Sequence, residues 1–155
     1  MRVVNIVSLW ENPIKLILSK PIRRFAADMV KDDKKCLLVF ASGKIIATGF
    51  RSMKDVGKSI KKRYPEAKLI KIVNITATVT LRSRPNIINC PGVVYEPEIF
   101  PACVWHQGKH CVVYYSTGKL ILTGCKTYKE LYQLFSAFRK SINTATTDSK
   151  STETV

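Results

Sequence analysis

The chain contains two similar stretches, and this internal repeat limits the possible folds more than any other feature. Residues 40–55 read FASGKIIATGFRSMKD and residues 115–130 read YSTGKLILTGCKTYKE, an offset of 75 residues. A long repeat of this kind indicates one supersecondary unit that occurs twice. The sequence therefore predicts a duplicated domain, with a first copy over 1–67 and a second over 68–142. The polar, Thr- and Ser-rich residues 143–155 are predicted to form a disordered tail.

Each copy is predicted to contain several strands followed by one amphipathic helix. Runs of β-branched and apolar residues predict strands at 3–9, 25–30, 36–41, 44–50, 68–80, 102–106, 110–116 and 119–125. A capping box begins each long helix, with Ser52 and Asp55 in the first copy and Thr127 and Glu130 in the second. A further short helix is predicted at 13–20, with Pro13 in its first turn.

Both faces of the central strands are apolar, which is unusual for an antiparallel sheet. Because side chains alternate across a strand, Leu37, Val39, Ile45 and Ala47 share one face, while Leu38, Phe40, Ile46 and Thr48 share the other. The second copy repeats this pattern, with Val112, Tyr114, Leu120 and Leu122 on one face and Val113, Tyr115, Ile121 and Thr123 on the other. Two helices cover only one face, so the other is predicted to be a binding surface. Burial of this face by a homodimer or by the connecting segments is the alternative.

The charge of the chain indicates a polyanionic ligand. Its 26 Lys and Arg residues outnumber 11 Asp and Glu residues, for a net charge of +15. An apolar face ringed by cations suits the DNA minor groove, where A·T pairs offer only acceptors and the guanine amino group is the blocking donor. Aliphatic side chains with a few Asn and Thr donors therefore favour A/T-rich DNA, and aromatic side chains at the ends could open a base step.

Other classes of function have little support in the sequence. The five cysteines form no CxxC pair, which favours a reducing compartment. Cys103, His106, His110 and Cys111 have zinc-binding side chains, but they lie across a predicted strand, turn and strand, so no metal and no cofactor are predicted. No apolar run is long enough to span a membrane, and a soluble, intracellular protein is expected. The sequence contains no carboxylate pair, catalytic triad or phosphate-binding loop, so we expect no enzyme.

Four segments resemble the TATA-box-binding protein family: RRFAA at 23–27, FASGKIIATG at 40–49, YEPEIFP at 95–101 and STGKLILTG at 116–124. The resemblance implies an α+β saddle, in which two pseudo-symmetric repeats form a curved antiparallel sheet with helices on the convex face. It also implies a general transcription initiation factor that binds and bends A/T-rich, TATA-like promoter DNA through the minor groove. The implied partners are a transcription factor IIB-like protein and RNA polymerase. The implied location is the nucleus, or the site of transcription in a viral or other non-standard host.

The resemblance also implies a role for each matching residue. The intercalating aromatic residues are Phe25 and Phe40 in the first copy and Phe100 and Tyr115 in the second. The central hydrogen-bonding residues are Asn5, Asn74, Thr48 and Thr123. The other groove contacts are Val7, Leu38, Ile46, Val113, Ile121 and Thr76, and the phosphate contacts are Arg24, Lys31, Lys44, Arg51, Lys119 and Lys126. The partner-binding loop consists of Glu96, Pro97, Glu98 and Ile99.

The chain departs from the family pattern at several positions. Tyr115 replaces a phenylalanine, Thr76 replaces an apolar groove contact, and His106 stands where arginine is common. The segments from Asn5 to Phe25 and from Asn74 to Phe100 are also shorter than usual. These departures favour a second hypothesis, in which a divergent scaffold or interaction module of a transcription complex has weak or no independent DNA binding.

Overall fold

The computed structural model describes residues 1–19 and 26–148, with side chains described as far as residue 143. These residues form two compact units. The first consists of Val3–Ile75, and the second contains Met1–Arg2 and the chain from Thr76 onward. The predicted copies divide at 67/68, whereas the compact units divide at 75/76. The difference arises because one long strand, β5, begins in the first unit and ends in the second.

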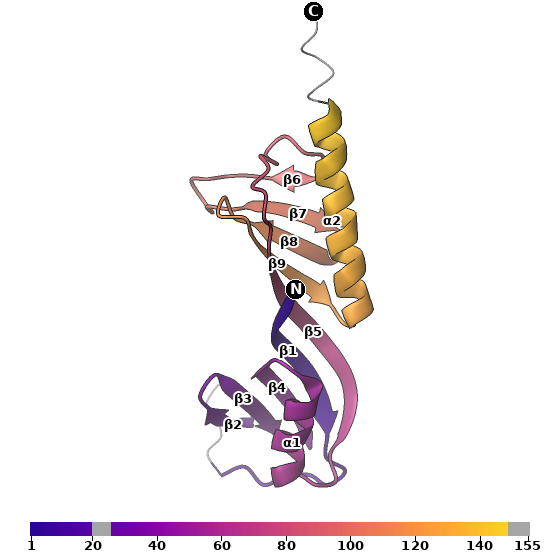
Figure 1. The fold of residues 1–155 in the computed structure, drawn as a ribbon. Coiled ribbons are helices and arrows are strands. Elements are labelled where there is room, and N and C mark those ends of the chain that lie inside the picture. The colour runs from indigo at the N-terminus through magenta and orange to yellow at the C-terminus, as the bar shows by residue number, and fades with distance from the viewer. Residues whose placement is uncertain (20–25, 149–155) are drawn as a thin grey trace, which may run out of the picture. The chain divides into compact units, whose positions relative to one another are not determined.

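The first unit is a sheet with one helix across it (Figure 1). Its elements are β1 (Arg2–Glu11), β2 (Ala27–Asp32), β3 (Lys35–Phe40), β4 (Lys44–Phe50), α1 (Met53–Arg63) and the first part of β5 (Lys68–Thr80). The strand order is β2-β3-β4-β1-β5, and the pairs β2/β3, β3/β4 and β1/β4 are antiparallel. Alternate residues of β3 and β4, including Leu37 and Ile45, pack with Val56 and Ile60 of α1 to form the core.

The second unit repeats this arrangement. Its elements are the last part of β5, β6 (Val93–Val94), β7 (Cys103–Gln107), β8 (His110–Tyr114), β9 (Lys119–Cys125) and α2 (Tyr128–Asp148). The strand order is β5-β9-β8-β7-β6, with antiparallel pairs from β9 to β6. Helix α2 lies along the sheet (Figure 1) and buries Leu131, Leu134 and Phe138 against it. The rings of Trp105 and Phe138 meet edge to face at 5.7 Å.

Both predicted capping residues begin their helices. The Ser52 hydroxyl accepts a hydrogen bond from the Asp55 N–H at 3.2 Å, and the Thr127 hydroxyl accepts one from the Glu130 N–H at 3.1 Å. The return bonds differ from the predicted capping box. The Asp55 carboxylate accepts from the Ser52 hydroxyl at 2.9 Å, and the Glu130 carboxylate accepts from the Lys126 N–H.

Two local predictions are wrong. The helix predicted at 13–20 is absent over 13–19, because Asn12 and Leu16 bond to the hairpin turn between β3 and β4 instead, and residue 20 lies outside the described residues. The Asn12 N–H donates to the Gly43 carbonyl at 2.8 Å, and the Leu16 N–H donates to the Ala41 carbonyl at 3.0 Å.

The tail was predicted from residue 143, but α2 continues to Asp148, and 149–155 lie outside the described residues. In the part of the chain that the structure describes, no helix combines the length and apolarity of a membrane span.

Candidate nucleic-acid interface

The open face of the first unit, defined as the sheet face opposite α1, carries a row of apolar side chains. Residues that pair across antiparallel strands project from the same face. Leu9 pairs with Ile46, Ile46 with Leu38, and Leu38 with Met29, so the row crosses β1, β4, β3 and β2. Three of these side chains are half-buried and Met29 is exposed. The intervening residues, such as Leu37 and Ile45, are buried beneath α1, which confirms the predicted alternation.

The open face of the second unit, opposite α2, carries a matching row. Ile121 pairs with Val113, Val113 with Val104, and Val104 with Val94, across β9, β8, β7 and β6. Val94 is exposed and the other three are half-buried. The two units therefore present similar apolar surfaces on the face that their own helices leave uncovered.

A polar row lies beside each apolar row. The rows are Thr48, Cys36 and Lys31 in the first unit, and Thr123, Cys111 and His106 in the second. Each member of the first row is related to its counterpart by the repeat offset of 75 residues. Both cysteines are free and half-buried. Each row places a hydroxyl near the centre of the sheet and a cation or imidazole toward its outer strands.

Asn5 extends the polar row of the first unit onto β1. Its side chain accepts hydrogen bonds from the Gly49 N–H at 2.7 Å and from the Thr48 hydroxyl at 3.4 Å. A backbone N–H can only donate, so the atom facing Gly49 is the amide oxygen. This orientation leaves the NH₂ group of Asn5 as the donor available to a ligand. In the second unit, the Thr76 and Thr123 hydroxyl oxygens lie 3.1 Å apart.

The two predicted intercalating residues of the second unit contact each other. The rings of Phe100 and Tyr115 are 6.2 Å apart at an interplanar angle of 65°. Phe100 is exposed and Tyr115 is half-buried. In the first unit Phe40 is half-buried, while its predicted partner Phe25 lies outside the described residues.

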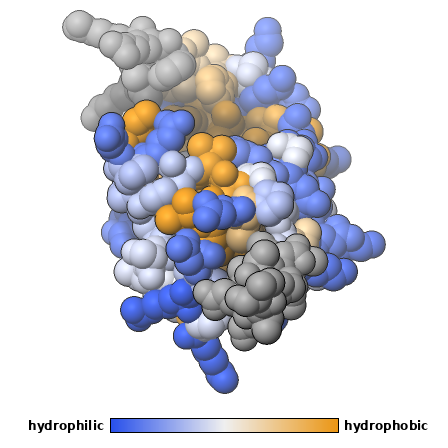
Figure 2. Space-filling model, turned by 90° about the horizontal axis from the view of Figure 1, so that it is seen from above, coloured by the Kyte–Doolittle hydropathy of each residue, from blue (hydrophilic) through white to orange (hydrophobic). Residues whose placement is uncertain are grey.

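Taken together, the predicted DNA contacts fall into three groups. Half-buried residues on the open faces are Asn5, Val7, Leu38, Phe40, Ile46, Thr48, Asn74, Thr76, Val113, Tyr115, Ile121 and Thr123. Exposed residues are Lys31, Lys44, Arg51, Phe100, Lys119 and Lys126. Arg24 and Phe25 lie outside the described residues. In the view of Figure 2, apolar surface lies in patches bordered by hydrophilic side chains.

The predicted partner loop is exposed to solvent. Glu96, Pro97, Glu98 and Ile99 all lie on the surface, and the Ile99 side chain is 79% exposed. The Glu96 carbonyl accepts hydrogen bonds from the N–H groups of Ile99 and Phe100, both at 2.9 Å. The loop is therefore a tight turn that presents two carboxylates and one aliphatic side chain.

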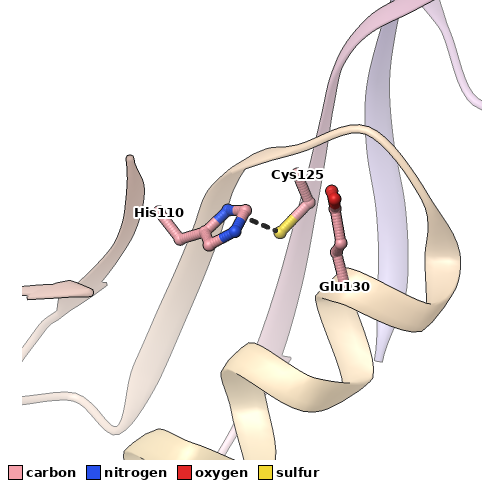
Figure 3. Close-up of side chains that lie close together, drawn as sticks. All are labelled: His110, Cys125 and Glu130. Atoms are coloured by element: carbon pink, nitrogen blue, oxygen red, sulfur yellow. Dashed lines mark hydrogen bonds between the residues drawn. The ribbon is translucent and has the colours of Figure 1, made fainter. Parts of the chain in front are cut away.

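The structure does not bring together the four residues considered for zinc. Cys103 is buried on the helix side of β7, whereas His106 and Cys111 pair on the open face. His110 instead approaches Cys125 and Glu130, as Figure 3 shows. Burial raises the pKa of the Cys125 thiol, and the charge of Glu130 raises it further. The hydrogen bond from the Lys126 N–H lowers the pKa of Glu130.

Sequence reasoning missed several open-face residues. Met29, Leu9, Val94 and Val104 complete the apolar rows, and Cys36 and Cys111 lie in the polar rows. Alternation along the strand from Leu38 to Cys36 was the signal available for Cys36. Val94 gave no such signal, because β6 contains only two residues.

Comparisons with known proteins agree with this fold. Residues 21–68 and 69–145 match the family described as "Transcription factor TFIID (or TATA-binding protein, TBP)". TATA-box-binding protein 2 of Entamoeba histolytica is 30% identical over 176 residues, covering 89% of this chain and 82% of the relative. The TATA-box-binding protein of Methanococcus vannielii is 32% identical over 123 residues, covering 68% and 67%. The solved structure of Methanococcus jannaschii TBP matches with a TM-score of 0.81 at 25% identity, covering 92% of this chain and 97% of that one.

The duplicated unit of sheet and helix, together with these matches, defines a DNA-binding transcription factor rather than a member of an enzyme family. The fold predicted from the sequence is confirmed by the structural match. The chain belongs to the TATA-box-binding protein family, whose members are general transcription initiation factors.

Proposed function

We propose that this protein binds A/T-rich promoter DNA through the minor groove and uses the open faces of both units as the contact surface. The observation that carries the proposal is the orientation of Asn5. Its oxygen is held by the Gly49 N–H and the Thr48 hydroxyl, so its NH₂ group can donate to a ligand. The minor groove of A·T pairs presents only acceptors, the N3 atom of adenine and the O2 atom of thymine.

The apolar rows supply a preference against guanine. Ile46 and Leu38 in one unit, and Ile121 and Val113 in the other, would pack against the floor of the groove. A guanine amino group beneath these side chains would lose its hydrogen bonds to water and gain none, at a cost of about 1–3 kcal/mol. Discrimination therefore comes from an unsatisfied donor at G·C pairs as well as from the bonds made at A·T pairs.

The aromatic residues supply the bend. Phe100 is exposed beside Tyr115 and can wedge into a base step, which partly unstacks it and kinks the duplex. Lys31, Lys44, Arg51, Lys119 and Lys126 are exposed and contact phosphates in this proposal. If all five make contacts, the logarithm of affinity falls with the logarithm of salt concentration with a slope of about −4 to −5.

Replacing A·T by inosine·cytosine pairs tests whether the protein contacts the minor groove. An I·C pair has the major-groove edge of G·C but lacks the 2-amino group, so its minor groove resembles that of A·T. We expect TATA-like and I·C duplexes to bind within about threefold of each other, and the G·C duplex about 100-fold more weakly, which two lost contacts explain. Fluorescence anisotropy at one fixed salt concentration measures all three. An I·C duplex as weak as the G·C duplex would place the contacts in the major groove and contradict the proposal.

The exposed loop Glu96–Ile99 is the proposed contact for a transcription factor IIB-like protein, through which RNA polymerase is recruited. Its two carboxylates and exposed Ile99 suit a partner surface with basic and apolar groups. Glu98→Arg is expected to weaken partner capture on promoter DNA at least 10-fold and to leave DNA affinity within twofold, in a mobility-shift assay with added partner. Glu66→Arg, an equal charge change at another exposed site, is the control. Equal effects of both variants would contradict the loop assignment.

The proposed location is the nucleus or another site of transcription.

A scaffold without independent DNA binding is the second candidate function. The hydroxyl of Tyr115 makes wedging costlier, and Thr76 places a hydroxyl, 3.1 Å from that of Thr123, where the family has an apolar contact. Equal and weak binding to all three duplexes, together with intact partner capture, is the outcome that would favour the scaffold.

A further inference from the structure

We propose that His110, Cys125 and Glu130 bind one divalent cation of the zinc class at the junction of β8, β9 and α2. The proposal is independent of DNA binding, because the three residues lie at the helix side of the second unit. Imidazole, thiolate and carboxylate are the three side-chain groups that bind Zn²⁺ in proteins.

The three ligands come from three elements that converge. His110 is the first residue of β8, Cys125 is the last residue of β9, and Glu130 lies in the first turn of α2. One ligand atom of each residue lies within 4.8 Å of the other two, and Figure 3 shows the His110 ring facing the Cys125 sulfur with the Glu130 side chain beside Cys125. Tetrahedral zinc separates its ligands by roughly 3.5 Å, given bond lengths of about 2.0–2.3 Å. Binding therefore requires the three side chains to move closer together.

Two of the ligands already have the supporting hydrogen bonds of a metal site. The His110 Nδ1 lies 3.0 Å from the Gly124 carbonyl, which can only accept, so Nδ1 carries the proton and Nε2 has the free lone pair. The Glu130 carboxylate accepts the Lys126 N–H. Metal-binding histidines and carboxylates are typically oriented by such outer contacts. Cys125 Sγ lies 3.6 Å from Nδ1 of the same ring, so the ring must turn for Nε2 and the sulfur to share one ion.

The site is also accessible. A cavity of about 430 Å³ adjoins it and is lined by Gln107, His110, Glu130, Gln133, Leu134 and Ala137. Cys125 is fully buried, while His110 and Glu130 are half-buried at the cavity wall. The cavity gives an ion a path from solvent and leaves space for a water molecule as the fourth ligand.

Comparison with the first unit shows that helix capping explains only part of this cluster. The repeat offset of 75 residues relates His110, Cys125 and Glu130 to Lys35, Phe50 and Asp55. Only the acidic residue is common to both units, because both use it to cap a helix. In the first unit Lys35 instead lies over the Phe50 ring, with Nζ 5.8 Å from its centre. Capping therefore accounts for Glu130 but not for the histidine and cysteine that meet it.

Titration of the chelator-treated full chain with Co²⁺ tests the proposal, since a thiolate ligand gives an intense near-ultraviolet charge-transfer band. We expect one equivalent of Co²⁺ to produce this band and Zn²⁺ to displace it. Cys125→Ala should abolish the band. The matched control Cys111→Ser removes a half-buried cysteine of the open face and should keep it.

Glu130→Gln separates metal binding from folding. The glutamine oxygen can still accept the Lys126 N–H, so the cap is retained, but the loss of the negative charge should weaken Zn²⁺ binding at least 10-fold. This variant decides the question if Cys125→Ala does not fold. Absence of the band in the unmodified protein, a band that persists in Cys125→Ala, or unchanged Zn²⁺ affinity in Glu130→Gln would each overturn the proposal.

Discussion

Ile46→Glu will lower the affinity for an A/T-rich duplex about 100-fold, equivalent to about 2.8 kcal/mol. Ile46 is half-buried at the centre of the apolar row, between Leu9 and Leu38. A carboxylate there would face groove acceptors and phosphates without a donor and would lose its hydration. The side chain does not belong to the core beneath α1, so the fold should remain intact.

Lys58→Gln is the matched control for this prediction. It changes the net charge by the same one unit, but it lies on the exposed side of α1. Fluorescence anisotropy gives the affinities, and circular dichroism checks the fold of both variants. The control should weaken binding no more than about threefold. An exposed charge on α1 acts on DNA mainly through an electrostatic field that salt screens. Similar losses in the two variants would show that net charge, not the open face, determines affinity.

Gly49→Ala will destabilise the protein by about 3 kcal/mol and lower its melting temperature by about 6–12 °C. Gly49 has φ of +85°, where side chains with a Cβ are strained. A Cβ there would lie 1.9 Å from the Lys34 carbonyl oxygen, so the backbone must move. That movement also disturbs the hydrogen bond from the Gly49 N–H to Asn5.

Gly108→Ala separates the effect of backbone strain from the effect of the steric clash. Gly108 also has a positive φ, +57°, but nothing lies within 4 Å of a Cβ at that position. The strain of the backbone alone should cost about 1 kcal/mol. Differential scanning calorimetry compares the two variants. A Gly49→Ala protein that melts within 2 °C of the Gly108→Ala protein would be incompatible with a steric clash at Lys34.

The repeat and the period of the strands were sufficient to predict most of the fold. Buried Leu37 and half-buried Leu38 show that neighbouring apolar residues lie on opposite faces, as the alternation predicted. The helix predicted at 13–20 is absent over the described residues because eight residues are too few to form a stable helix alone. Tertiary bonds from Asn12 and Leu16 to the adjacent turn took its place.

The candidate site was predicted less completely than the fold. Asn5 was identified through the family resemblance, but the direction of its amide depends on Gly49, 44 residues away. The meeting of His110, Cys125 and Glu130 depends on strand register and on the position of α2, neither of which sequence spacing gives. Composition also favoured a tail at 143–155, although polar residues can continue a helix that is already anchored by Phe138 and Ile142.

Strand β5 makes the first unit depend on residues beyond the predicted first copy. In the first unit β1 lies between β4 and β5, yet β5 begins only at Lys68, beyond the predicted end of the first copy at residue 67. A fragment cut at residue 67 would leave β1 with unsatisfied backbone groups along one side, and such an edge recruits another chain. The isolated first half is thus expected to self-associate rather than persist as a monomer.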